Sequence, residues 1–224
     1  MFTILKKLAG AVLAAGLAVN TPAALASGSA TYHVTITNIT HSINFTPIMV
    51  ASHRHPVGIF ELGAPAGDEL AAIAEGGDTS LLQAALEEMS HVVDIQSSGG
   101  LLGPGQSVTV VVSAKHGARR ISLASMMLPT NDGFIALDSV RAPRHGSSTF
   151  YSPGYDAGTE ANDELCASIP GPTCGGAGLS PGDNPGDEKF VHIHRGMHGV
   201  GDLDAAVYDW RNPVAKITIS RVSH

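Results

Sequence analysis

The sequence predicts an all-β protein, an antiparallel β-sandwich of about eight strands with a short helical insertion. Apolar and polar residues alternate with a period of two in several short segments, which is typical of strands with one buried face. Gly, Pro, Asn and Asp separate these segments at the spacing of a sandwich. The 26 glycines and 13 prolines, with aromatic residues at only 5%, disfavour a bundle of long helices.

The first residues of the chain predict a signal peptide rather than part of the fold. Two lysines precede an apolar stretch at residues 8–19, which is too short to span a bilayer. Small residues at positions 24 and 26 suit a signal peptidase, so we expect residues 1–26 to be removed and residues 27–224 to form one domain. A retained membrane anchor or a buried helix is the alternative. The expected location is periplasmic or secreted.

Eight segments are expected to form the strands. In the first, Val34 and Ile36 alternate with polar residues, and in the last Ile217 and Ile219 do the same, so these side chains should face the core. The other segments are short apolar runs between turn residues. In chain order, the expected strands cover residues 31–37, 46–51, 58–62, 92–96, 108–114, 121–128, 134–140 and 215–219.

A helical insertion interrupts the strands at residues 68–89. Its apolar residues fall at helical intervals that Gly76 and Gly77 break, which predicts two short helices on one side of the sandwich. Ser80 and Gln83 have the spacing of a capping box for the second helix. Residues 170–189 are rich in Gly, Pro and Asp, and they predict a long exposed loop.

The two cysteines are expected to form a local disulfide. Cys166 and Cys174 bracket a segment with two prolines and a glycine, which can fold back on itself. An exported protein meets an oxidising compartment, which disfavours two free buried thiols. A metal site would need further ligands nearby. The bridge should brace a loop rather than create the fold.

Charge and motifs exclude several functions. The formal charge is −7, and removal of the leader's two lysines leaves 11 basic against 20 acidic residues, a net charge of −9. This balance argues against a nucleic-acid binder or a protein held to anionic membranes by bulk charge. The sequence has no Gly-x-Ser-x-Gly elbow, no phosphate-binding glycine loop and no His-Glu-x-x-His helix. Hydrolase and nucleotide-binding functions therefore lack a starting residue.

Two loops carry oxygen ligands. Asn131 and Asp132 lie between two apolar strands, and a later acidic segment contains Asp156 and Glu160 around a glycine. Calcium takes six to eight oxygens from carboxylates, amides and backbone carbonyls, so these loops predict a site for a hard cation. The alternative is a pair of solvated turns in which Asp and Asn cap backbone amides.

A family resemblance rests on the same loops. Residues 123–134, Leu-Ala-Ser-Met-Met-Leu-Pro-Thr-Asn-Asp-Gly-Phe, followed by residues 155–160, Tyr-Asp-Ala-Gly-Thr-Glu, resemble the spondin N-terminal domain family, especially its bacterial members. Weaker similarities run in the same order along nearly the whole predicted mature chain. The resemblance implies an antiparallel β-sandwich similar to calcium-dependent phospholipid-binding domains. It attaches no catalytic activity to the fold.

The resemblance also implies a site and a role. One calcium ion would lie at one end of the sandwich, bound by Asp132, Asp156 and Glu160. Backbone carbonyls of the two loops and Asn131 are our own expected additions to this set. Animal members have Asp in place of Glu160, and they carry thrombospondin-type modules that this chain lacks. The implied role is adhesion or surface interaction with an extracellular protein, a glycan or a surface ligand, and contact with a membrane stays open. Glu188, in the Gly/Pro-rich loop, is expected to lie outside the site.

Three histidines form a competing constellation. His192, His194 and His198 lie within seven residues and could bind zinc or copper in an oxidising compartment. The alternative is a strand with exposed or hydrogen-bonding histidines, since no cysteine or carboxylate completes the set in sequence. The second functional hypothesis is therefore a transition-metal protein, either a scavenger or a small metalloenzyme.

Overall fold

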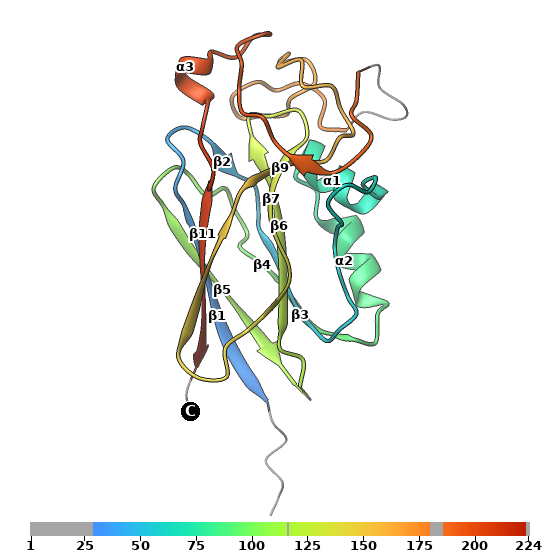
Figure 1. Ribbon diagram of the computed structural model, residues 1–224, viewed down its shortest axis with the longest axis vertical. Coiled ribbons are helices and arrows are strands. Elements are labelled where there is room, and N and C mark those ends of the chain that lie inside the picture. The colour runs from blue at the N-terminus through green and yellow to red at the C-terminus, as the bar shows by residue number, and fades with distance from the viewer. Residues whose placement is uncertain (1–28, 116, 180–185, 223–224) are drawn as a thin grey trace, which may run out of the picture.

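A computed structural model describes residues 29–115, 117–179 and 186–222 (Figure 1). The predicted signal peptide, residues 1–26, lies outside the described residues and stays a prediction. The elements in chain order are β1 (Ala30–Asn38), β2 (Asn44–Phe45), β3 (Met49–His53), α1 (Asp68–Gly76), α2 (Ser80–Glu87), β4 (Val92–Ser97), β5 (Ser107–Ala114), β6 (Arg120–Leu128), β7 (Gly133–Arg141), β8 (Ser147–Ser152), β9 (Gly154–Asp156), β10 (His192–Ile193), α3 (Ala205–Tyr208) and β11 (Ala215–Val222).

Two antiparallel sheets face each other, which confirms the predicted sandwich. One sheet has the strand order β5-β1-β11-β8, and the other has the order β10-β9-β7-β6-β3-β4, with β2 also paired to β6. The first and last long strands, β1 and β11, pair over their length, with Ile36 opposite Ile217 and Val34 opposite Ile219. The two terminal strands thus form the central pair of the first sheet, and β11 ends at the lower end of the molecule in Figure 1.

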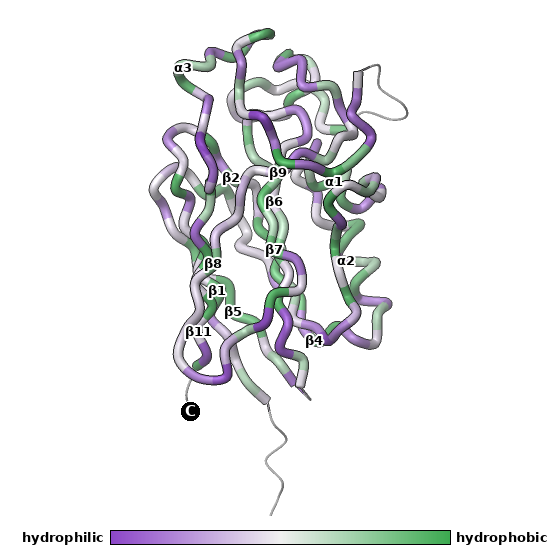
Figure 2. The backbone as a smooth tube through the Cα atoms, in the orientation of Figure 1, coloured by the Kyte–Doolittle hydropathy of each residue, from purple (hydrophilic) through white to green (hydrophobic). Residues whose placement is uncertain are grey.

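The main core lies between the sheets, and the period of two decides which side chains enter it. Val34, Ile36, Ile217 and Ile219 are fully buried, as the alternation predicts. Strand β6 behaves differently, because almost every residue in it is buried. Figure 2 shows the same contrast as a largely hydrophobic tube along β6 and β7. A strand covered on both faces needs a continuous apolar run, and residues 121–128 supply one.

The cover on the second face comes from the helices. Leu70 and Ile73 of α1 and Leu82 and Leu86 of α2 pack with the outer side of β3, β6 and β7 in a second apolar cluster. The predicted helical insertion is therefore confirmed, but the capping box is wrong. The Asp78 carboxylate, rather than the Gln83 side chain, accepts the Ser80 N–H at 2.8 Å, and the Gln83 amide donates to Glu87 instead. The N-cap residue is Thr79 rather than Ser80. No helix among the described residues combines the length and apolar character needed to cross a membrane.

The strand predicted at residues 58–62 is wrong. Ile59 donates its N–H to Asp138 Oδ1 at 2.8 Å instead of pairing with a strand. The ring of Phe60 packs against Phe134 and Tyr155, with centroid distances of 5.5 and 5.0 Å. These rings belong to the cluster on the outer face of the sheet. An apolar run can thus cover a sheet without joining it, because side-chain burial does not require a ladder of backbone hydrogen bonds.

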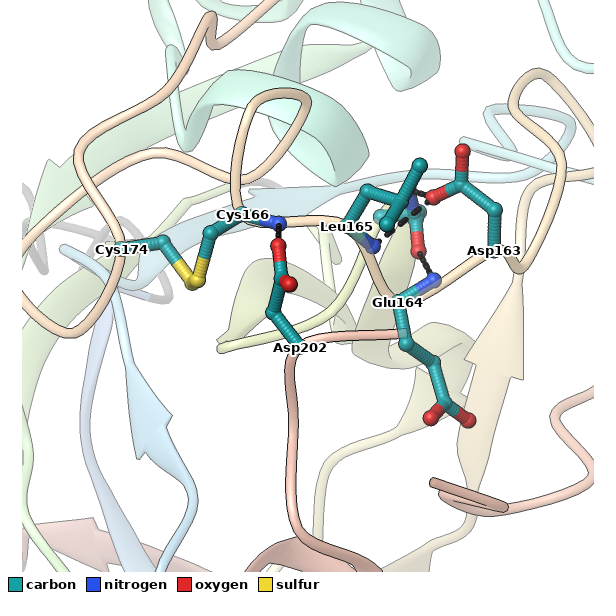
Figure 3. The surroundings of a disulfide bond; sticks show 7 residues. Asp163, Glu164, Leu165, Cys166, Cys174 and Asp202 are labelled. Carbon is teal, nitrogen blue, oxygen red and sulfur yellow. Dashed lines mark hydrogen bonds between the residues drawn. A yellow bond between two sulfur atoms is a disulfide. The ribbon is translucent and has the colours of Figure 1, made fainter. Parts of the chain in front are cut away.

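The disulfide prediction is confirmed. Cys166 and Cys174 are bonded, with a separation of eight residues, in the loops above the sandwich (Figure 3). The Asp202 carboxylate accepts the Cys166 N–H at 2.9 Å. The bridge therefore braces a surface loop. The hydrogen bond to Asp202 ties that loop to a second loop, which follows β10.

Candidate metal centre

The predicted oxygen ligands lie at the end of the sandwich where β6 ends and β7 begins. The β6–β7 loop, strand β9 and strand β10 meet there (Figure 1). Gly133 pairs with Asp156 across β7 and β9, and Asp156 pairs with His192 across β9 and β10. The sheet register thus brings three segments together that are up to 60 residues apart in sequence. The register also places the carboxylate loops next to the histidine strand. In the sequence these two groups of residues were alternative metal sites.

Asp132 is held in a tight turn with one oxygen unsatisfied. Thr130 Oγ1 accepts the Gly133 N–H at 2.9 Å and shapes the turn. Asp132 Oδ2 accepts the N–H groups of Thr159 and Glu160 at 2.7 and 3.1 Å. Asp132 Oδ1 is buried and has no hydrogen-bond partner within residues 29–115, 117–179 and 186–222. Burial, and then the negative charge of Asp156, raise the pKa of Asp132 well above its usual range.

Asp156 is the second fully buried carboxylate. Its Oδ1 accepts the Gly158 N–H at 2.8 Å, and its Oδ2 accepts the Asn162 amide at 2.7 Å. Burial raises the pKa of Asp156, while the Asn162 hydrogen bond and the charge of His192 lower it. Each carboxylate oxygen has two lone pairs, so these bonds leave acceptor capacity for a cation.

Glu188 is the residue that sequence reasoning misplaced. One ligand atom each from Asp156, Glu188 and His192 lies within 4.8 Å of the other two. Glu188 Oε2 is buried and finds no hydrogen-bond partner in the described part of the chain, and Glu188 Oε1 accepts the Asn162 amide at 3.2 Å. Its carboxylate therefore belongs to the cluster rather than to the solvated loop. Nothing in the Gly/Pro-rich composition around it signals that role.

Gly158 explains how the later segment reaches the cluster. This residue has a φ of +68°, in the left-handed region, and a Cβ there would collide with the backbone of Phe190. The Lys189 N–H bonds the Gly158 carbonyl at 2.8 Å. A glycine at this position therefore lets the segment that carries Glu188 and His192 lie directly on the acidic loop.

The three predicted histidines do not share one role. His192 Nδ1 lies 3.6 Å from Asp156 Oδ1, and His194 Nε2 lies 3.9 Å from Asp156 Oδ2. His194 is buried, and burial lowers its pKa to about 3, so its ring is neutral. His198 is half exposed and faces Glu164, with 4.0 Å between Nδ1 and Oε1. Among the described residues, the cluster that converges contains only His192 of the three.

Asn131 and Glu160 organise the loops around the cluster. The Asn131 amide donates to Asp163 at 3.0 Å, and its oxygen accepts the Glu164 N–H at 3.1 Å. Glu160 is buried and supplies its backbone N–H to Asp132. The Asn131 side chain therefore links the β6–β7 loop to the segment that leads to Cys166.

The cluster suits a divalent cation on physical grounds. Asp132, Asp156 and Glu188 gather negative charge where water is scarce, and burial together with the neighbouring charge raises the pKa of Asp132 and of Asp156. Among the described residues, no donor bonds to Asp132 Oδ1 or to Glu188 Oε2. Buried acceptors without donors are costly, and a cation would neutralise the charge and satisfy the oxygens together.

Comparison with known proteins gives one family. The family model described as Spondin_N matches residues 30–162, which is more than half of the chain. The match includes Asp132, Asp156 and Glu160 and ends before Glu188 and His192. No curated protein matches the chain significantly.

Proposed function

The chain belongs to the spondin N-terminal domain family, and on that premise we propose that it is an exported, non-enzymatic, calcium-binding β-sandwich that acts as an interaction module. The family is one of non-catalytic domains, and it indicates an extracellular-type module. The disulfide between Cys166 and Cys174 fits an oxidising compartment.

The observation that carries the calcium proposal is the pair of buried oxygens without donors, Asp132 Oδ1 and Glu188 Oε2. Asp156 lies on β9, which pairs with β7 next to Asp132, and its carboxylate also lies close to that of Glu188. The three carboxylates offer the hard oxygen ligands that calcium prefers. Bound calcium would neutralise the carboxylates and hold the β6–β7 loop against the segment that carries Glu188. The residues present therefore fit the ion that the family resemblance implies.

The same end of the sandwich offers a surface for a partner. Phe190 and Ile193 flank the cluster and are 43% and 46% exposed, and Val200 in the following loop is 69% exposed. Exposed apolar side chains next to a charged site are typical of interaction surfaces. We expect an extracellular protein, a glycan or a surface ligand to bind there, with calcium ordering the loops that present these residues.

The test is a calcium titration of protein purified without chelator or histidine tag and then freed of metal. Calorimetry should detect one ion per chain, and calcium should raise the melting temperature. Asp156→Asn removes charge while nearly preserving shape, so it should weaken binding sharply. Asp68→Asn, an exposed aspartate at the start of α1, is the matched control and should bind as the wild type does. A wild type that binds no calcium at millimolar concentration refutes the proposal.

A further inference from the structure

The donor set of the cluster contains a nitrogen that calcium does not use. Calcium takes oxygen ligands, whereas imidazole suits zinc and other first-row transition metals. His192 offers a ring nitrogen within 4.8 Å of the ligand oxygens of Asp156 and Glu188. A single ion with bonds of about 2 to 2.5 Å can contact atoms at that spacing after small side-chain movements. One nitrogen and two carboxylates form a three-residue zinc set of the kind that leaves a fourth position for water.

His192 is oriented toward the cluster by its surroundings. Strand pairing fixes its backbone opposite Asp156. Its ring packs against Phe190, with centroids 5.1 Å apart. The Phe190 carbonyl can only accept, so His192 Nδ1, 3.1 Å away, donates its proton to it, and the lone pair that can bind a metal lies on Nε2. A hydrogen bond from the other ring nitrogen to a backbone carbonyl is a usual way in which a metal-binding imidazole is held. The ring is half-buried, so an ion can reach it from solvent.

His194 is excluded as a ligand by its own hydrogen bond. The Gly196 N–H donates to His194 Nδ1 at 3.0 Å, so Nδ1 carries the lone pair. The neutral ring then carries its proton on Nε2, which is the atom that faces Asp156. An N–H group cannot bind a metal, but it can support the negative charge of Asp156. His192 is therefore the metal ligand, and His194 is a positioning residue next to Asp156.

We propose that this cluster binds zinc through His192, Asp156 and Glu188, and that zinc and calcium exclude one another because both use Asp156 and Glu188. The inference rests on the proposed function only in placing a cation at this end of the sandwich. It assigns the metal preference to residues 188–192, which lie outside the matched family region. The nitrogen ligand is thus a feature of this chain's own later segment.

Zinc and calcium titrations of three variants test the inference, with untagged protein and calorimetric detection. His192→Gln should weaken zinc binding at least about tenfold, in line with other lost metal-site contacts, and leave calcium binding within about threefold. Glu188→Gln should weaken both metals. His198→Gln is the matched control, because His198 faces Glu164 outside the cluster, and it should bind both metals as the wild type does. Melting curves in chelator show whether each variant is folded.

Competition separates this inference from the calcium proposal. Saturating calcium should raise the apparent dissociation constant of zinc, and cobalt used as a spectroscopic substitute should show a nitrogen-ligand spectrum that His192→Gln loses. Equal zinc affinity of wild type and His192→Gln, or simultaneous binding of both metals, overturns the inference while the calcium proposal stands. Zinc binding that His192→Gln weakens, in a protein that binds no calcium, refutes calcium as the cation and supports His192 as a zinc ligand.

Discussion

Replacing Asp132 with asparagine should produce opposite effects with and without calcium. In the metal-free protein, Asp132 is fully buried, and its raised pKa means that burial and the charge of Asp156 outweigh its two backbone hydrogen bonds. An asparagine oxygen can accept the same N–H groups of Thr159 and Glu160. Its amide would replace the unpaired Oδ1 with a donor. Asp132→Asn should therefore raise the melting temperature of the metal-free protein near neutral pH.

With calcium, the order should reverse. Calcium at 100 times its dissociation constant adds about 2.7 kcal/mol to the unfolding free energy if the unfolded chain does not bind it. For a domain of this size, 1 kcal/mol corresponds to about 2 to 4 °C, so the wild type should gain about 5 to 11 °C. Asp132→Asn should lose most of that gain at the same calcium concentration, because it removes a negative charge beside Asp156.

The pH dependence gives a second signature. A carboxylate with a raised folded-state pKa binds more protons in the folded than in the unfolded chain, so its contribution to stability falls as the pH rises. The cost of ionised Asp132 is absent below its unfolded pKa of about 3.9 and grows as the pH rises through the folded value. The advantage of Asp132→Asn in chelator should therefore be small near pH 4 and larger at pH 8.

The assay is thermal unfolding, followed by circular dichroism, in chelator and in calcium at several pH values. Asp68→Asn is the control, since this exposed carboxylate should give wild-type curves in every condition. A lower melting temperature for Asp132→Asn than for wild type in chelator at pH 7 would show that other groups compensate the buried charge. An unchanged calcium response of Asp132→Asn would remove this residue from the site.

Three further predictions concern the fold. Ile217→Asp should unfold the domain, because it places an unpaired charge between the sheets at a cost above about 4 kcal/mol. Thr218→Asp, on the other face of the strand, should leave the domain folded. Equal melting temperatures of the two variants would contradict the predicted facing of the strand. Reduction of the Cys166–Cys174 bridge should lower the unfolding free energy by about 2 to 3 kcal/mol at most and loosen its loop without global unfolding. Intact-mass measurement after alkylation checks the pairing, and two alkylated thiols in the unreduced protein would refute it. Phe60→Ala should cost about 2 kcal/mol in denaturant titrations through its lost ring contacts, and an unchanged midpoint would show that the segment is not anchored by that ring.

The long strands could be predicted because their sequence pattern is local. Alternation places Ile36 and Ile217 on one face whatever the strand's neighbours are, and both are buried as expected. Strand β8 was missed because Ser147–Ser152 is mostly polar, as suits a strand at the edge of its sheet. The false strand at residues 58–62 has the opposite cause. Ile59 and Phe60 pack half-buried on the outer face of a sheet without joining it, and a run of that length does not distinguish packing from pairing.

By itself, the sequence determined the sandwich, the helical cover, the disulfide and the acidic loops that contain Asp132 and Asp156. Each of these follows from a short segment whose spacing or residue types limit its structure. Only the tertiary structure decided that Glu188 and His192 join those loops, while Asn131 turns to the neighbouring segment. The reason is physical, because a cation site depends on distances of a few ångströms between side chains. Those distances are set by the pairing of β9 with β10 and by the close backbone approach at Gly158. Neither feature leaves a periodic signal in the sequence.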